Sequence, residues 1–321
     1  MVAQSNPGES IKRLTPAHAE SIIACFHRVY GDSYANEIYY DRALLTQALT
    51  DASIRSIGGF LDGKLVGHMA MTTRDPQAGT AELGNTVVDP DARGTGLAWR
   101  IAAALTEWTL ECGYTGYVHY PTTDHHIMQR QSVKSGIETG LMMGYIPAET
   151  DGQVRESASP KRGAATIVYE QLTQNDPKEG YLPSVYFDRI SNMTEACGLS
   201  RQWEEGRQPD GKTVVEIYES NRRGLSRIHT KHIGEDFLKT LNAADTRQPC
   251  HQLDLLLSDP GIDQAVTNAL ELGWVFCGWL PGFSSHDILR LQKFDPAQTE
   301  LNPGVVNPTA IQLLNDIQQG L

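Results

Sequence analysis

The stretch from residue 83 to residue 98 restricts the fold more than any other part of the sequence. It reads Leu-Gly-Asn-Thr-Val-Val-Asp-Pro-Asp-Ala-Arg-Gly-Thr-Gly-Leu-Ala, which is a strand pattern followed by a glycine-rich turn. The apolar segment Leu97–Cys112 then predicts a helix. Gly94 and Gly96 permit backbone angles that other residues avoid. Because the first N–H groups of a helix point at one spot, this unit predicts a phosphate site, to which Arg93 adds a charge-assisted contact.

The segments around this unit predict a mixed sheet with helices on its faces, an α/β fold. Asp62-Gly63 is a strong hairpin turn signal. Antiparallel strands come first and strand–helix units follow, which is the order of a mixed sheet. The expected helices are 15–29, 40–48, 97–112 and 125–135, and the expected strands are 53–61, 64–72, 81–88, 117–120, 139–145 and 164–171.

The second half of the chain repeats a similar order of elements. Strands are expected at 213–219, 225–230, 251–257 and 273–279, and helices at 183–197, 236–243, 261–272 and 308–319. In both halves a helix, a glycine (Gly136 or Gly273), a short strand and a proline follow one another. We interpret this as a duplication, although common punctuation would give the same pattern. The 321 residues suit two domains, 1–172 and 173–321, with polar 149–162 as a surface loop or linker.

The motif Arg93-x-x-Gly96-x-Ala98 resembles the pyrophosphate-binding motif of the GNAT acyl-CoA N-acyltransferases, Gln/Arg-x-x-Gly-x-Gly/Ala. Val88-Asp89-Pro90 matches the Val-x-Pro that precedes it in that family. The glycine spacing of a dinucleotide site and the Gly-Lys-Ser/Thr of a P-loop are absent. A glycine turn without a ligand is the alternative interpretation.

The resemblance implies that acetyl-CoA or another acyl-CoA binds in the first half as a co-substrate. The strand before the loop would splay from its neighbour, and the gap would receive the pantetheine arm. The residues that the resemblance assigns to the cofactor are Val87, Val88, Arg93, Gly94, Thr95, Gly96, Leu97 and Ala98.

The catalytic candidates are Glu82, His125 and Ser132. GNAT enzymes often carry a glutamate on this strand, and a carboxylate can take the proton of an amine, so Glu82 is the preferred base. In the family's helix Asn-x-x-Ala-x-x-x-Tyr-x-x-x-Gly, His125 falls at the Asn and Ser132 at the Tyr that often serves as acid. Serine is a poorer acid, and both residues have ordinary helical roles as alternatives. His125 and His126 point about 100° apart on a helix, so no metal site is expected.

The tyrosines Tyr30, Tyr34, Tyr39 and Tyr40 cluster after the first helix. In GNAT folds this region walls the acceptor site, and aromatic side chains there can hold a substrate. Packing explains the same cluster equally well.

Composition limits the partners. The chain has 27 basic and 39 acidic residues and a formal net charge of −12, which argues against nucleic acid. Arg222-Arg223 and Lys161-Arg162 are short basic pairs of the kind found in solvated loops. No stretch is apolar enough to cross a membrane, and the five cysteines form no CxxC pair, so a cytoplasmic location is expected.

The second half has no Arg-x-x-Gly-x-Gly/Ala turn after a Val-x-Pro strand. The resemblance therefore implies a tandem GNAT protein whose second, degenerate domain has no cofactor. It implies direct transfer of an acetyl or other short acyl group to a small-molecule acceptor, an amine, by a monomer or a homodimer. The alternatives are an acyl-CoA-binding regulatory module without turnover, or an enzyme that uses a carrier protein or decarboxylation chemistry.

Overall fold

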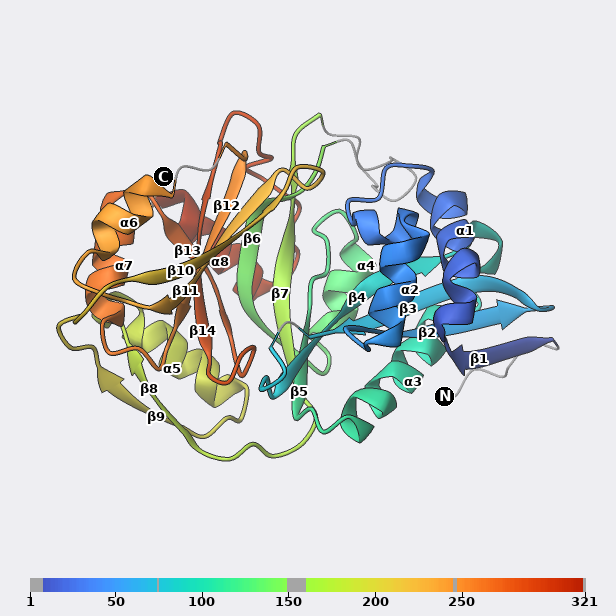
Figure 1. Cartoon of the computed structure of the whole chain (residues 1–321), viewed down its shortest axis with the longest axis horizontal. Coiled ribbons are helices and arrows are strands. Elements are labelled where there is room, and N and C mark those ends of the chain that lie inside the picture. Colours follow the sequence, from blue (N-terminus) through green and yellow to red (C-terminus); the bar gives the residue numbers. More distant parts are fainter. Residues whose placement is uncertain (1–7, 74, 149–159, 245–246, 320–321) are drawn as a thin grey trace.

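In the described part of the chain, a twelve-stranded sheet extends through both halves (Figure 1). The computed structural model describes residues 8–73, 75–148, 160–244 and 247–319. The strands follow the order β1-β2-β3-β4-β5-β7-β6-β13-β14-β12-β11-β10, and β8 and β9 form a separate two-stranded sheet. No helix in the described part of the chain is long and apolar enough to span a membrane.

The described residues of the first half form seven strands of the large sheet and four α-helices. Asp62 and Gly63 both have positive φ angles, 49° and 82°, which is the turn chemistry that closes the tight hairpin between β2 and β3. The elements are β1 (Glu9–Arg13), α1 (Ala19–Tyr30), α2 (Arg42–Thr50), β2 (Ile54–Leu61), β3 (Lys64–Thr72), β4 (Thr80–Val88), α3 (Leu97–Glu111), β5 (Gly116–His119), α4 (His126–Ser132), β6 (Ile137–Ile146) and β7 (Gly163–Gln171).

The second half supplies the other five strands of the large sheet. Its elements are β8 (Lys178–Leu182), α5 (Phe187–Ala196), β9 (Arg201–Glu205), β10 (Val214–Ser220), β11 (Leu225–His232), α6 (Phe237–Ala243), β12 (Cys250–Leu256), α7 (Ile262–Glu271), β13 (Val275–Leu280), β14 (Ile288–Phe294) and α8 (Pro308–Gln319). The order β10-β11-β12-β14-β13 has the same connections as β3-β4-β5-β7-β6 in the first half.

The two halves join where β6 lies beside β13. Gly140 pairs with Gly278 at this point. A Cβ atom added to Gly140 would lie 2.4 Å from the carbonyl oxygen of Cys277, and one added to Gly278 would lie 2.9 Å from the Cα of Gly140. Only glycine permits this approach, so the joint depends on both residues.

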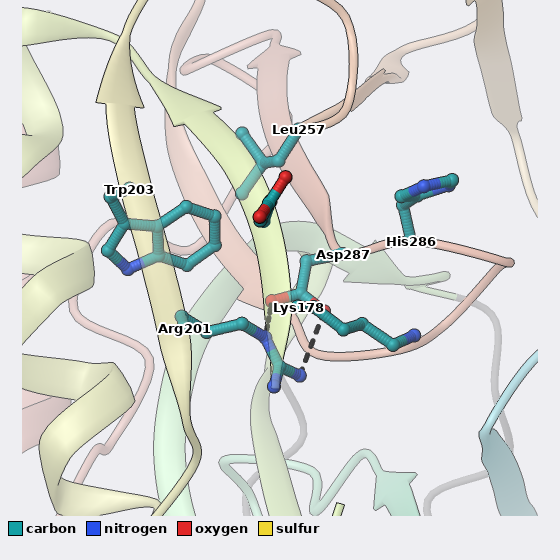
Figure 2. A pocket seen from close by; sticks show the side chains of 7 residues that line it. Lys178, Arg201, Trp203, Leu257, His286 and Asp287 are labelled. Carbon is teal, nitrogen blue, oxygen red and sulfur yellow. Dashed lines mark hydrogen bonds and ion pairs between the residues drawn. The ribbon is translucent and has the colours of Figure 1, made fainter. Parts of the chain in front are cut away.

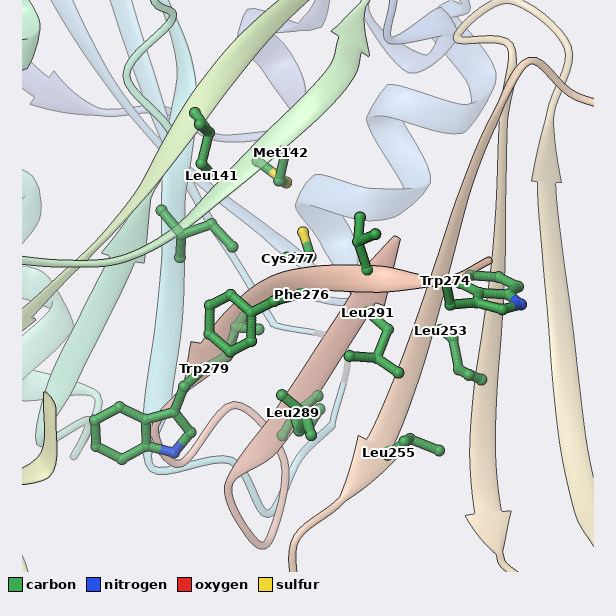
Figure 3. Close-up of a cluster of buried hydrophobic side chains, with 14 of the residues drawn as sticks. Leu141, Met142, Leu253, Leu255, Trp274, Phe276, Cys277, Trp279, Leu289 and Leu291 are labelled. Atoms are coloured by element: carbon green, nitrogen blue, oxygen red, sulfur yellow. The ribbon is translucent and has the colours of Figure 1, made fainter. Parts of the chain in front are cut away.

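The apolar cores explain how the halves are held together. Helices α1 and α2 pack on one face of the first-half sheet and α3 packs on the other. The largest core joins β6 and β7 to the second half, and Figure 3 shows Leu141 and Met142 in the same buried cluster as Trp279 and Leu289. Helix α8 returns to β6, where Glu138 accepts hydrogen bonds from Asn307 and from the N–H of Ala310. Burial raises the pKa of Glu138.

Most elements expected from the sequence are present, with ends that differ by a few residues, but four strands were missed. These are β1, β8, β9 and β14. Strand β14 reads Ile-Leu-Arg-Leu-Gln-Lys-Phe and buries Arg290 and Gln292, which hides its strand pattern. The expected loop at 149–162 lies mostly outside the described residues. Arg162 within it is buried rather than solvated, and its Nε donates to the carbonyl of Gly144 at 2.7 Å.

Candidate functional site

Strand β4 separates from β5 in the middle of the first-half sheet. The two strands are paired in parallel at Thr80, Ala81 and Glu82, and β4 then continues to Val88 beyond the last of these pairs. Residues 83–88 of β4 therefore have an edge that β5 does not cover. Such an edge can pair with an extended amide-bearing chain as another strand would.

A bulge at Asn85 produces this separation. Asn85 has φ 51°, and the register between β3 and β4 shifts at this point. The ring of His68 fixes the bulge, because its Nδ1 lies 2.9 Å from the carbonyl of Asn85, which can only accept, and its Nε2 lies 3.0 Å from the hydroxyl of Ser56. Burial lowers the pKa of His68 to about 4, so the ring is neutral. Tyr34 donates to the Asn85 side chain at 3.0 Å.

The glycine-rich turn lies between β4 and α3. Gly94 and Gly96 have φ angles of 75° and 77°, and Gly96 is the residue that caps α3. Leu97 is buried beneath the turn, whereas Arg93 is exposed. The Nε of Arg93 donates to the carbonyl of Val88 at 3.2 Å, which holds its guanidinium beside the end of β4. The turn thus brings a helix N-terminus and a cation together, as anion sites require.

Two partly buried ion pairs hold the turn in place. Arg100 on α3 binds Glu9 through two hydrogen bonds of 2.8 and 2.7 Å, and its Nη1 donates to the carbonyl of Thr95 at 3.0 Å. Asp89 accepts from the Nε of Arg28 at 2.7 Å. Burial raises the pKa of Asp89, but the hydrogen bonds from Arg28 and from the Asp91 N–H outweigh it, and the pKa lies below its usual value. The turn is therefore shaped before any ligand binds.

Glu82 lies at the last paired position of β4, where the strands begin to separate. The hydroxyl of Tyr120, which follows β5, donates to Glu82 at 3.4 Å. The rings of Tyr120 and Tyr145 lie 6.1 Å apart, and Arg223 of the second half donates to the Tyr145 hydroxyl at 2.7 Å. Burial raises the pKa of Tyr120 well above its usual value, so the phenol stays protonated. A carboxylate, two phenols and a guanidinium thus form one connected group.

The four tyrosines after α1 divide between packing and the site. Tyr39 is fully buried and stacks on Phe26 with a centroid distance of 4.1 Å. Tyr30 is also buried, and burial raises its pKa to about 12. Tyr34 binds the bulge, and Tyr40 lies under the guanidinium of Arg222. Packing accounts for Tyr30 and Tyr39, whereas Tyr34 and Tyr40 contact groups of the site.

His125 and Ser132 have local partners on α4. His125 caps this helix, and its Nδ1 accepts from the N–H of Met128 at 3.3 Å. The hydroxyl of Ser132 is buried and donates to the carbonyl of Met128 at 2.8 Å. These contacts are the ordinary helical roles, and they do not connect either residue to Glu82 or to the glycine turn. The described residues contain no group of three or more His, Cys, Asp or Glu that could hold a metal ion.

The equivalent strands of the second half do not separate. β11 and β12 are paired in parallel at six successive positions, from Leu225 with Cys250 to Thr230 with Leu255. Asp254 on β12 accepts two hydrogen bonds from Arg290 on β14, which is fully buried. Strand pairing therefore occupies the place where the first half has an open strand edge.

A small pocket lies on the second half, beside β8 and β9 (Figure 2). Its charged groups have partners, since Arg201 forms two hydrogen bonds with Asp287 and Lys178 donates to the carbonyl of Ser285. These pairs give the pocket a structural role.

The sequence indicated the turn and Glu82 but not the residues that complete the site. His68 and Tyr120 lie in ordinary strand patterns, so only their positions in the fold reveal them. The interpretation of Arg222-Arg223 as a solvated loop was wrong: both side chains are half-buried against the first half. The partners of these arginines are far away in the sequence, so no local pattern indicates them.

Solved structures of acetyltransferases are similar to about half of the chain. An N-acetyltransferase from Staphylococcus aureus Mu50 has 14% identity and a TM-score of 0.40 and covers 53% of this chain and 99% of its own. PaiA N-acetyltransferase from Thermoplasma acidophilum, in complex with coenzyme A, has 16% identity and a TM-score of 0.37, and the match covers 51% of this chain and 99% of that protein. The putative acetyltransferase yncA from Salmonella typhimurium, solved with acetyl-CoA, has 17% identity and a TM-score of 0.41, and the match covers 54% of this chain and 97% of that protein. No curated protein matches the chain.

The family comparison matches the part of the chain that carries the site. Residues 18–129 match the model of the acetyltransferase (GNAT) family. The matched residues run from the start of α1 to α4 and include the bulge, the glycine turn and Glu82. This part of the chain is therefore an acetyltransferase domain of the GNAT family.

Proposed function

We propose that the protein transfers an acetyl or other short acyl group from acyl-CoA to a small acceptor amine, directly and within a ternary complex. The observation that carries this proposal is the position of Glu82 at the end of the β4–β5 pairing, next to an open strand edge that leads to the glycine turn. This geometry suits a phosphate group at the turn, an extended arm along the open edge and a general base at Glu82.

The first half would bind the cofactor. The helix N-terminus at residues 94–98 and the guanidinium of Arg93 suit a pyrophosphate, because both offer donors to phosphate oxygens. The open backbone edge at Val87 and Val88 suits the amides of pantetheine. PaiA and yncA, which are similar to this chain, were solved with coenzyme A and acetyl-CoA.

Glu82 would act as the general base. An ammonium group is no nucleophile, so the carboxylate, directly or through water, takes one proton from it. The amine nitrogen then attacks the thioester carbonyl carbon, the new C–N bond forms and the C–S bond breaks. Coenzyme A leaves as the thiolate and takes up the second proton that the attacking nitrogen gives up, so the products are the amide and the free thiol. Tyr120, which donates to Glu82, would hold the carboxylate in position.

The second half would be a degenerate GNAT-like repeat, residues 173–321, that binds no cofactor and walls the acceptor side. The repeated strand order supports a duplication, and the closed β11–β12 pair supports the loss of the cofactor site. Together with residues 1–172 it would make a tandem protein.

The test is isothermal titration of the protein with acetyl-CoA, followed by an acceptor screen with a thiol-release assay. Saturable binding and release of coenzyme A that depends on an amine are the expected results. Binding without transfer to any amine would favour a regulatory module, and no binding would contradict the proposal.

A further inference from the structure

The turn between β10 and β11 carries two arginines of the second half onto the first half. The guanidinium of Arg222 lies 4.6 Å from the ring centroid of Tyr40, and its Nη2 donates to the carbonyl of Asp32. The Nη1 of Arg223 donates to the hydroxyl of Tyr145 at 2.7 Å. The acceptor side of the site is thus completed by residues from the far end of the sequence.

Buried scaffolding holds this turn in position. The Nη2 of Arg162 donates to the carbonyl of Arg223 at 2.5 Å, while its Nε donates to the carbonyl of Gly144. A Cβ atom added to Gly224 would lie 2.8 Å from the same guanidinium. The backbone at Arg223 is therefore held in position, which suits a residue that binds a ligand.

The partners of Arg222 and Arg223 are neutral. They are a carbonyl oxygen, an aromatic ring and a phenol, and no carboxylate among the described residues forms an ion pair with either arginine. An arginine guanidinium stays protonated in proteins, so Arg223 is a cation. A guanidinium has five N–H donors, and the described contacts use Nη1 alone, which leaves donors for a ligand. In a chain of net charge −12, this is a place where an anion is attracted.

Glu82 and Arg223 lie on either side of the same two tyrosines. Glu82 accepts from Tyr120, Tyr120 faces Tyr145 and Tyr145 accepts from Arg223. Glu82 is also among the groups that raise the pKa of Arg223, so the two charges act on each other. A molecule with an amine at one end and an anionic group at the other matches this order of charges.

We infer that the acceptor is a small amine that also carries an anionic group, a carboxylate or a phosphate, and that Arg223 binds this group. The inference rests on the proposed function, because it takes Glu82 as the base of the same site. The planar fork of an arginine suits both anions, since it can donate two parallel hydrogen bonds to either.

The experiment compares acceptors that differ only in this charge. The probes are the common L-amino acids and longer ω-amino acids, the carboxamide of each, and phosphoethanolamine. We expect the carboxylate or the phosphate amine to be acetylated, and the carboxamides to be poor substrates. Replacement of Arg223 by Gln should raise KM for the anionic acceptor by about 10-fold to 100-fold with little change in kcat, because one charged hydrogen-bond partner is lost. Arg223→Lys should recover part of the loss.

The controls separate this inference from the proposed function. Lys231, an exposed cation on β11, forms an ion pair with Glu216. Its replacement by Gln should leave KM unchanged. Binding of the N-acetylated product to the protein saturated with coenzyme A, measured by calorimetry, gives a result without turnover. The inference would be overturned if the protein bound the anionic product and its carboxamide with equal affinity, or if it bound neither. Failure of wild-type protein to bind acetyl-CoA would instead overturn the proposed function.

Discussion

Glu82 is our candidate for the general base because of its position in the sheet. It is the last residue of β4 that pairs with β5, so its carboxylate lies where the strands part, and Tyr120 donates to it there. The side chain is neither deeply buried nor fully exposed. A carboxylate in this position can exchange protons with a bound amine and with solvent.

Replacement of Glu82 by Gln should lower kcat by about 100-fold or more, because the amide keeps its hydrogen bond to Tyr120 but cannot take a proton. The affinity for acetyl-CoA should not change. Steady-state kinetics and calorimetry measure the two quantities, and Glu107→Gln on the exposed side of α3 is the matched control. An unchanged kcat in Glu82→Gln would exclude this residue as the base.

His68 predicts a dependence of stability on pH. Burial lowers its pKa from 6.5 in the unfolded chain to about 4 in the folded protein. Between pH 6.5 and about pH 4, His68 is protonated in the unfolded chain but neutral in the folded protein. The free energy of unfolding is therefore highest above pH 6.5 and falls as the pH drops to about 4. The contribution of His68 is about 3 kcal/mol at most. Desolvation also lowers the pKa of His119 to about 4, and this residue acts in the same direction.

Urea unfolding at several pH values between 7 and 4 measures this effect. In His68→Asn the amide can still donate to the carbonyl of Asn85, and the loss of stability across this pH range should be smaller than in the wild type. The same loss in both proteins would show that His68 is not neutral in the fold.

At the scale of elements, the glycine turn depends on the ion pair that joins α3 to β1. Arg100 holds Glu9 and the carbonyl of Thr95 together, and both charged side chains are largely buried. Removing one member of a buried pair leaves the other unpaired, which costs more than removing both.

Arg100→Met should therefore lower the free energy of unfolding by about 3–5 kcal/mol, and the double variant Glu9→Leu/Arg100→Met should lose much less. Both variants should bind acetyl-CoA more weakly, because the Thr95 carbonyl has lost its donor. Chemical denaturation and calorimetry of the same samples test this. If the double variant is as unstable as Arg100→Met, the unpaired carboxylate is not the cause.

Elements with local signals could be predicted from the sequence, and the rest could not. Gly94 and Gly96 mark a turn because positive φ angles favour glycine, and the hairpin at Asp62-Gly63 is confirmed for the same reason. Arg223 gives no such signal, because its partner Tyr145 is 78 positions away. The pairing of β6 with β13 is also non-local, and the glycines that permit it look like any others in the sequence.

At the scale of the whole molecule, one sheet and one large core join the halves. The acceptor site that we propose extends from Glu82 in the first half to Arg223 in the second, so neither half alone would hold all of it. The β4–β5 edge of the first half is open, whereas the β11–β12 pair of the second half is closed. We propose on this ground that only the first half binds the cofactor.

Calorimetric titration with acetyl-CoA of the wild type, Gly94→Glu and Gly94→Asn tests the central claim most directly. Gly94 has φ 75° and open space around its Cβ position, so both side chains fit, and asparagine tolerates this backbone. We predict one site per chain in the wild type, retained binding in Gly94→Asn and at least about a 10-fold loss in Gly94→Glu, whose carboxylate repels the pyrophosphate. Two sites per chain, or equal affinity in all three proteins, would contradict the assignment of the cofactor to this turn.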